Sequence, residues 1–311
     1  MTLELFVEHT YLPYVAAQKR PSTYRGYKNI WKECLKQRCG GICLREFRTC
    51  DGERLLAEIA QQSELSRNTL KHIKSLLSGI FKHAKRLGVL NGINPIQDVS
   101  IPKGREGDDT FATTLEEINQ MLMVLPEPTA TVVATAAFLG VRKGELRGLL
   151  WENYRGSEVR VTQPVWGGFV TEPKTRKSKA PIPVIGPLAA KLDTLRLTQG
   201  NPEKGLIFTS CKGKPLDLNN VVRRLIKPTL EQVGLTWHGW HAFRRGLATN
   251  LYRLGVADKT IQAILRHADL STTMNSYVKS SSVDAVAAMK SLERICTSVH
   301  QTFGAKGARV V

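Results

Sequence analysis

Arginine, histidine, lysine and tyrosine side chains recur in four short segments of this 311-residue sequence. Side chains of these types can bind an anion or move a proton. The arginines are notable because their planar guanidinium groups stay charged and can bind an oxyanion through two parallel hydrogen bonds. The segments are residues 138–151, 171–184, 237–245 and 265–277.

In the first segment, Gly140 ends an apolar helix and Arg142 begins the next one. Glu145 follows three residues later on the same helical face, where its carboxylate can orient the Arg142 guanidinium. Taken alone, this pair could equally be an ion pair at the surface. In the third segment, His241 and Arg244 have a spacing that lets two side chains at a helix start converge on one anion.

The second and fourth segments are individually weak signals. Residues 171–184 form a basic loop between two predicted strands, which by itself could be a solvated hairpin, with Lys174, Lys177 and Lys179. In the fourth segment, His267 ends one helix and Tyr277 lies on the next. By itself, Tyr277 could be a packed aromatic residue.

In this order, however, the series of Arg, Lys, His-x-x-Arg, His and Tyr closely resembles the active site of the tyrosine recombinases, the phage integrase family. The resemblance covers the whole C-terminal part of the chain. Two positions depart from the common pattern, because Arg266 replaces the usual glycine and Arg245 replaces the usual histidine. Neither change removes a catalytic group. The resemblance implies the catalytic residues Arg142, Lys174, His241, Arg244, His267 and Tyr277, with Glu145 in a supporting position.

The reaction implied by this resemblance is phosphoryl transfer without a metal ion, ATP or another cofactor. Tyr277 would attack the scissile phosphate and leave a 3′-phosphotyrosyl link with a free 5′-hydroxyl. Lys174 would protonate the leaving oxygen, and Lys177 is the alternative for this step. The paired acidic residues at 108–109 and 116–117 fall in a linker and at a helix start, which disfavours the carboxylate cluster of a two-metal nuclease.

The net charge of the chain independently favours a polyanionic partner. The sequence has 45 Lys and Arg against 27 Asp and Glu, a formal charge of +18. Residues 1–107 and residues 108–311 are each basic, so the excess belongs to two folded regions rather than to one tail. The apolar runs are too short to cross a membrane, and the N-terminus lacks a signal-peptide pattern. We therefore expect a cytoplasmic protein that binds nucleic acid and no membrane.

The predicted fold is mainly α-helical with a small β-sheet (α+β). Residues 1–101 are predicted to be a helical domain, 102–110 a linker, and 111–311 a second domain. This second domain should begin with a capping box at residues 114–117 and a buried helix at 129–139. Its short strands are expected around residues 158–165, 169–171 and 181–185. The resemblance implies that the first domain binds core DNA and that the two domains clamp the duplex.

One helix of the first domain is a candidate DNA contact. Ser66 caps it, and it should end near Gly88. Its polar face carries five basic residues: Lys71, Lys74, Lys82, Lys85 and Arg86. Such a face is commonly only solvated, but the charge of the chain favours contact with the DNA backbone. Further candidate contacts are Lys177, Lys179 and Arg245.

Four of the six cysteines cluster between residues 34 and 50. None has the C-x2-C spacing and no histidine accompanies them, so reduced thiols are favoured over a zinc site.

The resemblance also implies an assembly. We expect double-stranded DNA with specific recombination sites as the partner, a homotetramer on two duplexes, and a monomer or weak oligomer in free solution. The same resemblance allows for an accessory partner, a DNA-bending or directionality factor. It also implies that this protein is bacterial, nucleoid-associated and encoded by a phage or mobile element. An apolar helical stripe in residues 282–299 should dock on a neighbouring protomer, or pack back on its own domain. The alternatives for function are a type IB topoisomerase and a non-catalytic DNA-binding relative.

Overall fold

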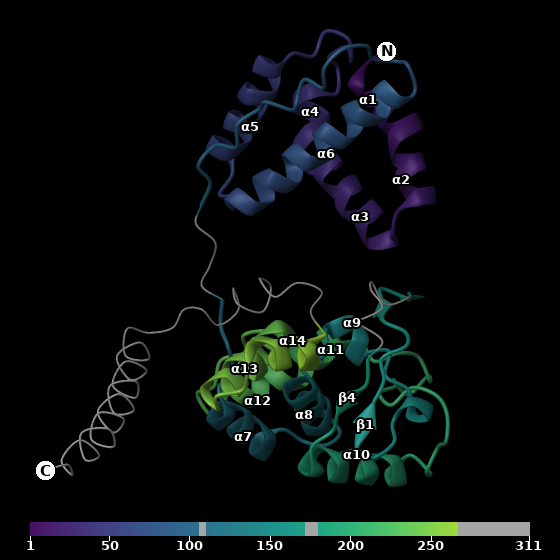
Figure 1. Cartoon of the computed structure of the whole chain (residues 1–311), viewed down its shortest axis with the longest axis vertical. Coiled ribbons are helices and arrows are strands. Elements are labelled where there is room, and N and C mark those ends of the chain that lie inside the picture. The colour runs from purple at the N-terminus through teal and green to yellow at the C-terminus, as the bar shows by residue number, and fades with distance from the viewer. Residues whose placement is uncertain (106–109, 172–179, 267–311) are drawn as a thin grey trace, which may run out of the picture. The chain divides into compact units, whose positions relative to one another are not determined.

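The computed structural model describes residues 1–105, 110–171 and 180–266. Internal contacts divide the chain into two units, Met1–Asp109 (unit 1) and Thr110–Val311 (unit 2) (Figure 1). None of the described helices is long and apolar enough to span a lipid bilayer.

Unit 1 is built from helices, and several continue into one another through a π-helical turn. Its elements are α1 (Leu3–Phe6), η1 (Val7–Tyr11), α2 (Leu12–Gln18), α3 (Pro21–Ile30), η2 (Trp31–Leu35), α4 (Lys36–Cys39), α5 (Thr49–Gln62) and α6 (Arg67–Arg86). The runs α1–η1–α2 and α3–η2–α4 are each unbroken along the chain. Within the described residues of this unit, strand-like pairing is confined to isolated bridges at Thr2–Cys43 and Ser66–Arg105, where the sequence predicts helices alone.

Helix α6 begins where the sequence predicts it. The Ser66 hydroxyl accepts a hydrogen bond from the Thr69 backbone N–H, which satisfies one of the free donors at the helix start. Apolar residues at helical spacing form one face that is fully buried in the core of unit 1: Leu70, Ile73, Leu76, Leu77, Ile80 and Phe81. Burying each of these side chains contributes about 1.5–3 kcal/mol. The basic face of α6 is consequently turned away from the core.

The predicted linker at 102–110 begins as part of unit 1. The Arg105 N–H donates to the Leu65 carbonyl at 3.2 Å, and the Arg105 carbonyl accepts from the Arg67 N–H at 3.3 Å. Gly104 lies so close to this helix start that a Cβ atom there would be 2.7 Å from the Arg67 nitrogen. The chain is therefore attached to the start of α6 up to residue 105.

Unit 2 contains helices and short strands around one apolar core. Its helical elements are α7 (Leu115–Val124), α8 (Thr129–Leu139), α9 (Lys143–Leu146), η3 (Trp151–Asn153), α10 (Gly186–Thr198), α11 (Leu218–Val221), η5 (Val222–Ile226), α12 (Lys227–Glu231), α13 (Trp240–Arg253) and α14 (Asp258–Leu265). The predicted capping box is present, because the Thr114 N–H donates to Glu117 and the Glu117 N–H donates to Thr114 Oγ1. Helix α8 has the predicted bounds.

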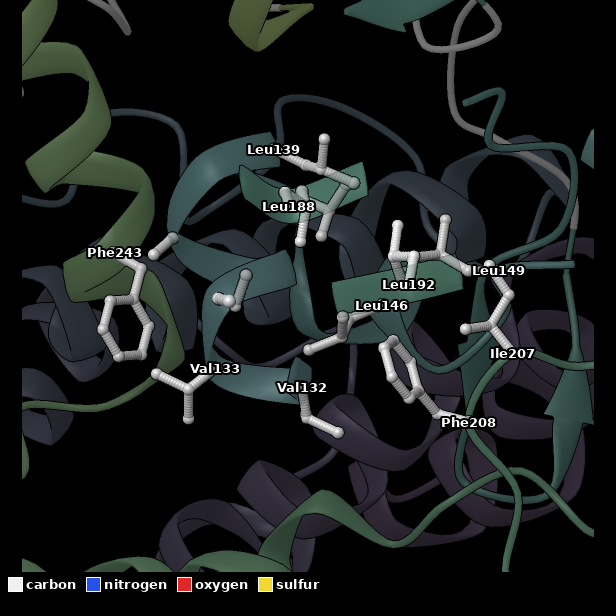
Figure 2. Packing of buried hydrophobic residues seen from close by; sticks show 14 of the residues in the cluster. Val132, Val133, Leu139, Leu146, Leu149, Leu188, Leu192, Ile207, Phe208 and Phe243 are labelled. Atoms are coloured by element: carbon white, nitrogen blue, oxygen red, sulfur yellow. The ribbon is translucent and has the colours of Figure 1, made fainter. Parts of the chain in front are cut away.

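Helix α8 lies at the centre of this core and is buried on nearly all sides. It packs against α7, α10 and α13. Figure 2 shows Val133 of α8 near Phe243 of α13, and Val132, Ile207 and Phe208 belong to the same cluster. Because α8 is enclosed, its C-terminal end is a fixed point from which the following turn projects.

The described strands form two separate two-stranded antiparallel sheets. β1 (Glu158–Val159) pairs with β4 (Ile182–Pro183), and β2 (Val165–Trp166) pairs with β3 (Phe169–Val170). The prediction of one strand over residues 158–165 was therefore wrong. Pro164 lacks the N–H needed to continue a ladder. Between β1 and β2, the Gln163 carbonyl lies so close to Gly148 that no Cβ atom fits at that position.

Candidate active site

Arg142 lies in the turn that follows α8. The helix ends at Gly140, whose φ of 56° is in the left-handed region that glycine adopts without strain. Arg142 then becomes the N-cap of α9, and Glu145 lies in the first turn. Glu145 Oε2 accepts from the Arg142 backbone N–H at 2.9 Å, and Oε1 accepts from Arg142 Nη1 at 2.8 Å. The contact expected from the spacing is present, with Glu145 buried and the Arg142 side chain 39% exposed.

Arg244 connects two segments that are far apart in the sequence. From α13, its Nη1 donates to the Gly140 carbonyl and its Nη2 donates to the Leu265 carbonyl. Burial, and then the positive charge of Arg142, lower the pKa of Arg244 to about 9, while Glu145 opposes them. The guanidinium therefore remains charged at neutral pH. It holds the end of α14 against the end of α8.

His241 lies in the first turn of α13, one turn before Arg244, and part of its surface is exposed. Burial of the remainder lowers the pKa of His241, and the nearby cations, led by Arg244, lower it further, against Glu145. A histidine with a pKa below the ordinary value of about 6.5 is neutral at pH 7. The ring can therefore accept a proton from a reacting group.

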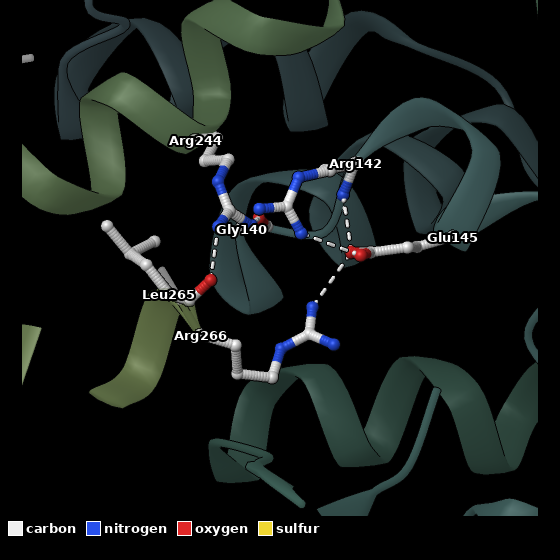
Figure 3. A network of polar contacts seen from close by, with 6 residues as sticks. All are labelled: Gly140, Arg142, Glu145, Arg244, Leu265 and Arg266. Carbon is white, nitrogen blue, oxygen red and sulfur yellow. Dashed lines mark hydrogen bonds and ion pairs between the residues drawn. The ribbon is translucent and has the colours of Figure 1, made fainter. Parts of the chain in front are cut away.

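Arg266 is a further charged residue of this site, and sequence reasoning singled it out only as a departure from the family pattern. It is the C-cap of α14, and its Nη2 donates to Glu145 Oε2 at 2.8 Å. Figure 3 shows the guanidinium groups of Arg142 and Arg266 directed at the Glu145 side chain, with that of Arg244 beside Arg142. Burial would raise the pKa of Glu145, but Arg266 and Arg142 bring it below its usual value. The available signal was a charged residue at a position where glycine is usual, since a buried charge needs a partner.

The remaining predicted catalytic residues lie outside the described residues. They are Lys174, His267 and Tyr277. The predicted DNA contacts Lys177 and Lys179 and the tail at 283–311 also lie outside the described residues. The structure does describe where the lysine segment begins. Thr171 donates from its N–H to the Pro164 carbonyl at 2.8 Å, and β2 packs against α9. The base of this segment is thus held beside the helix that carries Glu145.

Arg245, predicted as a DNA contact, is half-buried within unit 2. Its Nε donates to the Phe111 carbonyl at 2.7 Å. The Thr113 N–H donates to the Ala242 carbonyl at 3.2 Å, and the Phe111 ring stacks on His238 with centroids 3.5 Å apart. Arg245 therefore helps to attach the first residues of unit 2 to α13, the helix of His241 and Arg244.

The five basic residues predicted on α6 all line one groove of unit 1, here called the basic groove: Lys71, Lys74, Lys82, Lys85 and Arg86. Its wall also contains tyrosines. Arg86 Nη1 donates to the Tyr14 hydroxyl at 3.3 Å, and the His83 ring stacks on Tyr14 at 4.1 Å between centroids. Lys19 lines the same groove and was missed, because it follows the end of a different helix, α2, whose position only the fold reveals.

In the described ranges, no group of three or more His, Cys, Asp or Glu residues is placed to hold a metal ion. Cys39 is buried, and burial raises the pKa of its thiol to about 12. Cys34, Cys43 and Cys50 are also free thiols.

Comparisons with known proteins relate both the sequence and the fold to DNA recombinases. A "Tyrosine recombinase XerC-like" protein of Caldanaerobacter subterraneus subsp. tengcongensis is 25% identical over 304 residues, covering 86% of this chain and 77% of that protein. The Tn1549 transposon integrase, solved with transposon right end DNA, superposes with a TM-score of 0.77 at 18% identity, covering 94% of this chain and 100% of the other. A lambda integrase, solved as a tetramer bound to a Holliday junction, superposes with a TM-score of 0.68 at 18% identity. The match covers 89% of this chain and 77% of the lambda integrase chain.

The sequence model of the phage integrase family matches residues 112–283, a span that begins just before α7. It includes Arg142, Glu145, His241 and Arg244, which the fold brings together, and it extends through Tyr277. The match covers more than half of the chain, and the fold agrees with solved integrases over most of its length. The chain is a member of the phage integrase family of tyrosine recombinases.

Proposed function

We propose that this tyrosine recombinase carries out site-specific recombination with Tyr277 as its nucleophile. The observation that supports this most directly is the convergence of Arg142 and Arg244 beside one buried carboxylate, with neutral His241 on the same helix as Arg244. Two charged guanidinium groups from separate segments are suited to one phosphate whose negative charge increases during the reaction.

Residues of this chain supply the nucleophile, the proton acceptor and the proton donor that the cleavage step needs. The Tyr277 oxygen forms a bond to the scissile phosphorus, and the bond from phosphorus to the 5′-oxygen breaks. His241 accepts the phenol proton, which its lowered pKa permits at neutral pH. Lys174 gives a proton to the leaving 5′-oxygen, and His267 donates a hydrogen bond to a phosphate oxygen. The covalent link keeps the phosphate in an ester bond to Tyr277. A 5′-hydroxyl from a second duplex can therefore reverse the step without ATP or a metal ion.

The basic groove of unit 1 is the proposed DNA contact outside the active site. Lys71, Lys82 and Lys85 are exposed along one helix, where each can approach a backbone phosphate. The tyrosines in its wall limit the freedom of Arg86, whose guanidinium lies 5.7 Å from the centroid of the Tyr14 ring. Lys177, Lys179 and Arg245 are proposed as weaker contacts. Contacts of this kind provide affinity that depends strongly on salt concentration.

Recombination requires two duplexes, so we propose a homotetramer on DNA and a monomer or weak oligomer in free solution. Residues 283–311 are the proposed contact between protomers. Deleting them should leave single-site DNA binding intact and reduce synapsis and strand exchange, as light scattering of the DNA complexes would show. Tetrameric synapses formed by the truncated protein at full-length rates would contradict this role.

The relatives named above are bacterial or mobile-element recombinases, which supports a nucleoid-associated protein encoded by a phage or mobile element. An accessory DNA-bending or directionality factor is part of the same proposal.

The decisive experiment is covalent trapping on a nicked suicide substrate followed by sequencing of the attached DNA. The wild-type protein should give a covalent band on a denaturing gel, in EDTA as well as in its absence, and the sequence next to the link defines the site. Tyr277→Phe should give no band and bind DNA within a few-fold of wild type. A covalent band with the Phe variant would remove Tyr277 from its role. Relaxation of supercoiled DNA without a specific site would indicate a topoisomerase instead.

A further inference from the structure

Arg266 has no assigned role in the mechanism, yet its position in the fold is energetically unfavourable. Its side chain is 1% exposed, and the carboxylate that it meets, on Glu145, is 5% exposed. Its backbone φ of 55° lies in the left-handed region, where a residue with a Cβ atom is disfavoured. Both features cost free energy, and the contact with Glu145 helps to offset them.

The contact with Arg266 adds a third hydrogen bond to Glu145. Glu145 Oε2 receives the Arg142 backbone N–H at 2.9 Å and Arg266 Nη2 at 2.8 Å. Glu145 Oε1 receives Arg142 Nη1 at 2.8 Å. With Oε2 held from two directions, the carboxylate cannot rotate freely, and Oε1 stays directed at Arg142. Arg266 therefore acts on Arg142 through the orientation of one carboxylate.

The same contact fixes the end of α14. The last helical residue, Leu265, gives its carbonyl oxygen to Arg244, and the next residue, Arg266, is paired with Glu145. Two consecutive residues are thus held by separate charged side chains of the active site. The position that follows them in the sequence is His267.

We propose that Arg266 is a positioning residue of the active site. It orients the Arg142 guanidinium through Glu145 and fixes the backbone from which His267 follows. Because it is buried, it touches neither DNA nor the reacting atoms. A glycine at this position would relieve the backbone but leave Glu145 Oε2 with one partner fewer. This inference rests on the proposed function, since its readout is the cleavage step.

The test uses the full-length protein and single-turnover cleavage of the nicked suicide substrate. Arg266→Gly should cleave at least about tenfold more slowly at saturating DNA, because misdirected catalytic groups reduce rate more than binding. Its dissociation constant for DNA should stay within about threefold of wild type, since a buried residue adds no phosphate contact. Asn201→Gly is the matched control. Asn201 is the other described non-glycine residue with positive φ, at 57°, so this variant relaxes a similar backbone without altering the site.

Chemical rescue separates positioning from a general loss of structure. Millimolar methylguanidine should restore part of the cleavage rate of Arg266→Gly by occupying the vacated space beside Glu145. It should not help a variant that also carries Glu145→Gln, which lacks the carboxylate charge. Arg266→Lys should have an intermediate rate, because an ammonium group keeps the charge but not the planar fork.

Wild-type cleavage by Arg266→Gly would overturn the proposal, as would a rate loss matched by a proportional loss of DNA binding. If Arg266→Gly does not fold in a thermal melt, Arg266→Lys decides: slower cleavage with unchanged binding supports positioning, and a wild-type rate contradicts it. Failure of the proposed function looks different, because the wild-type protein itself would then form no covalent link through Tyr277.

Discussion

The two basic regions of this protein use their cations in opposite ways. In the basic groove of unit 1, five cations come from one helix, α6, and most are exposed. In the active site of unit 2, Arg142, Arg244 and Arg266 come from three segments, two of the three are buried, and Arg142 and Arg266 share the Glu145 carboxylate. Helical periodicity creates the first arrangement, whereas only folding creates the second.

This difference has energetic consequences. An exposed charge is screened by water and salt, so each cation of the basic groove contributes little and its neighbours can replace it. A buried guanidinium acts where screening is weak and its position is fixed, so its loss cannot be compensated by a neighbour. Substitutions in the active site should therefore change the rate of cleavage, and substitutions in the groove should change affinity.

The largest effect is expected from Arg244→Lys. Lysine keeps the charge but cannot donate to the Gly140 and Leu265 carbonyls and also face a phosphate. Single-turnover cleavage should fall by about 10³-fold or more. Binding to uncleaved DNA, measured by fluorescence anisotropy, should change little. A rate within tenfold of wild type would mean that the buried site tolerates substitution as the groove does.

Lys174→Ala should reduce cleavage by about 10²-fold or more, since it removes the proposed proton donor. Lys177→Ala, its matched control in the same segment, should retain most activity. A 5′-phosphorothiolate at the scissile position should restore cleavage by Lys174→Ala, because a thiolate leaves without a proton. Restoration confined to Lys177→Ala would assign the proton donor to Lys177.

The dependence of cleavage on pH tests whether His241 reacts in its neutral form. A lowered pKa means that protonation of His241 requires a more acidic solution than protonation of an ordinary histidine. The rate should decline only below the lowered pKa, by about tenfold for each further pH unit. His241→Gln should be slower at neutral pH and lack this acidic decline. An unchanged decline in the variant would assign it to another group.

The smallest effect is expected in the basic groove. Lys82→Ala should weaken DNA binding by only a few-fold and reduce the slope of log affinity against log salt by about one. Cleavage at saturating DNA should match wild type, because Lys82 lies in a unit that carries none of the proposed catalytic residues. A lower cleavage rate at saturation would show that the groove also acts in the chemical step.

Much of the local structure could be predicted because its causes are local. Ser66 and Thr114 begin helices through hydrogen bonds to residues three positions away, and Gly140 ends α8 by adopting a conformation that suits glycine. The helical spacing of lysines on α6 similarly predicts that they share one face. The strand over residues 158–165 was mispredicted, because Pro164 lacks the N–H needed to continue a ladder and the close approach of Gln163 to Gly148 is visible only in the fold.

The active site shows the same division between local and long-range causes. The residue types and order of Arg142, His241 and Arg244 are properties of the sequence, as is the contact of Arg142 with Glu145 across three positions. The pairing of Arg266 with Glu145 joins residues 121 positions apart, and that of Arg244 with Gly140 spans 104. No periodicity encodes such distances. The tertiary structure determines these contacts, because a buried charge is stable only where the packing of other segments supplies its partner.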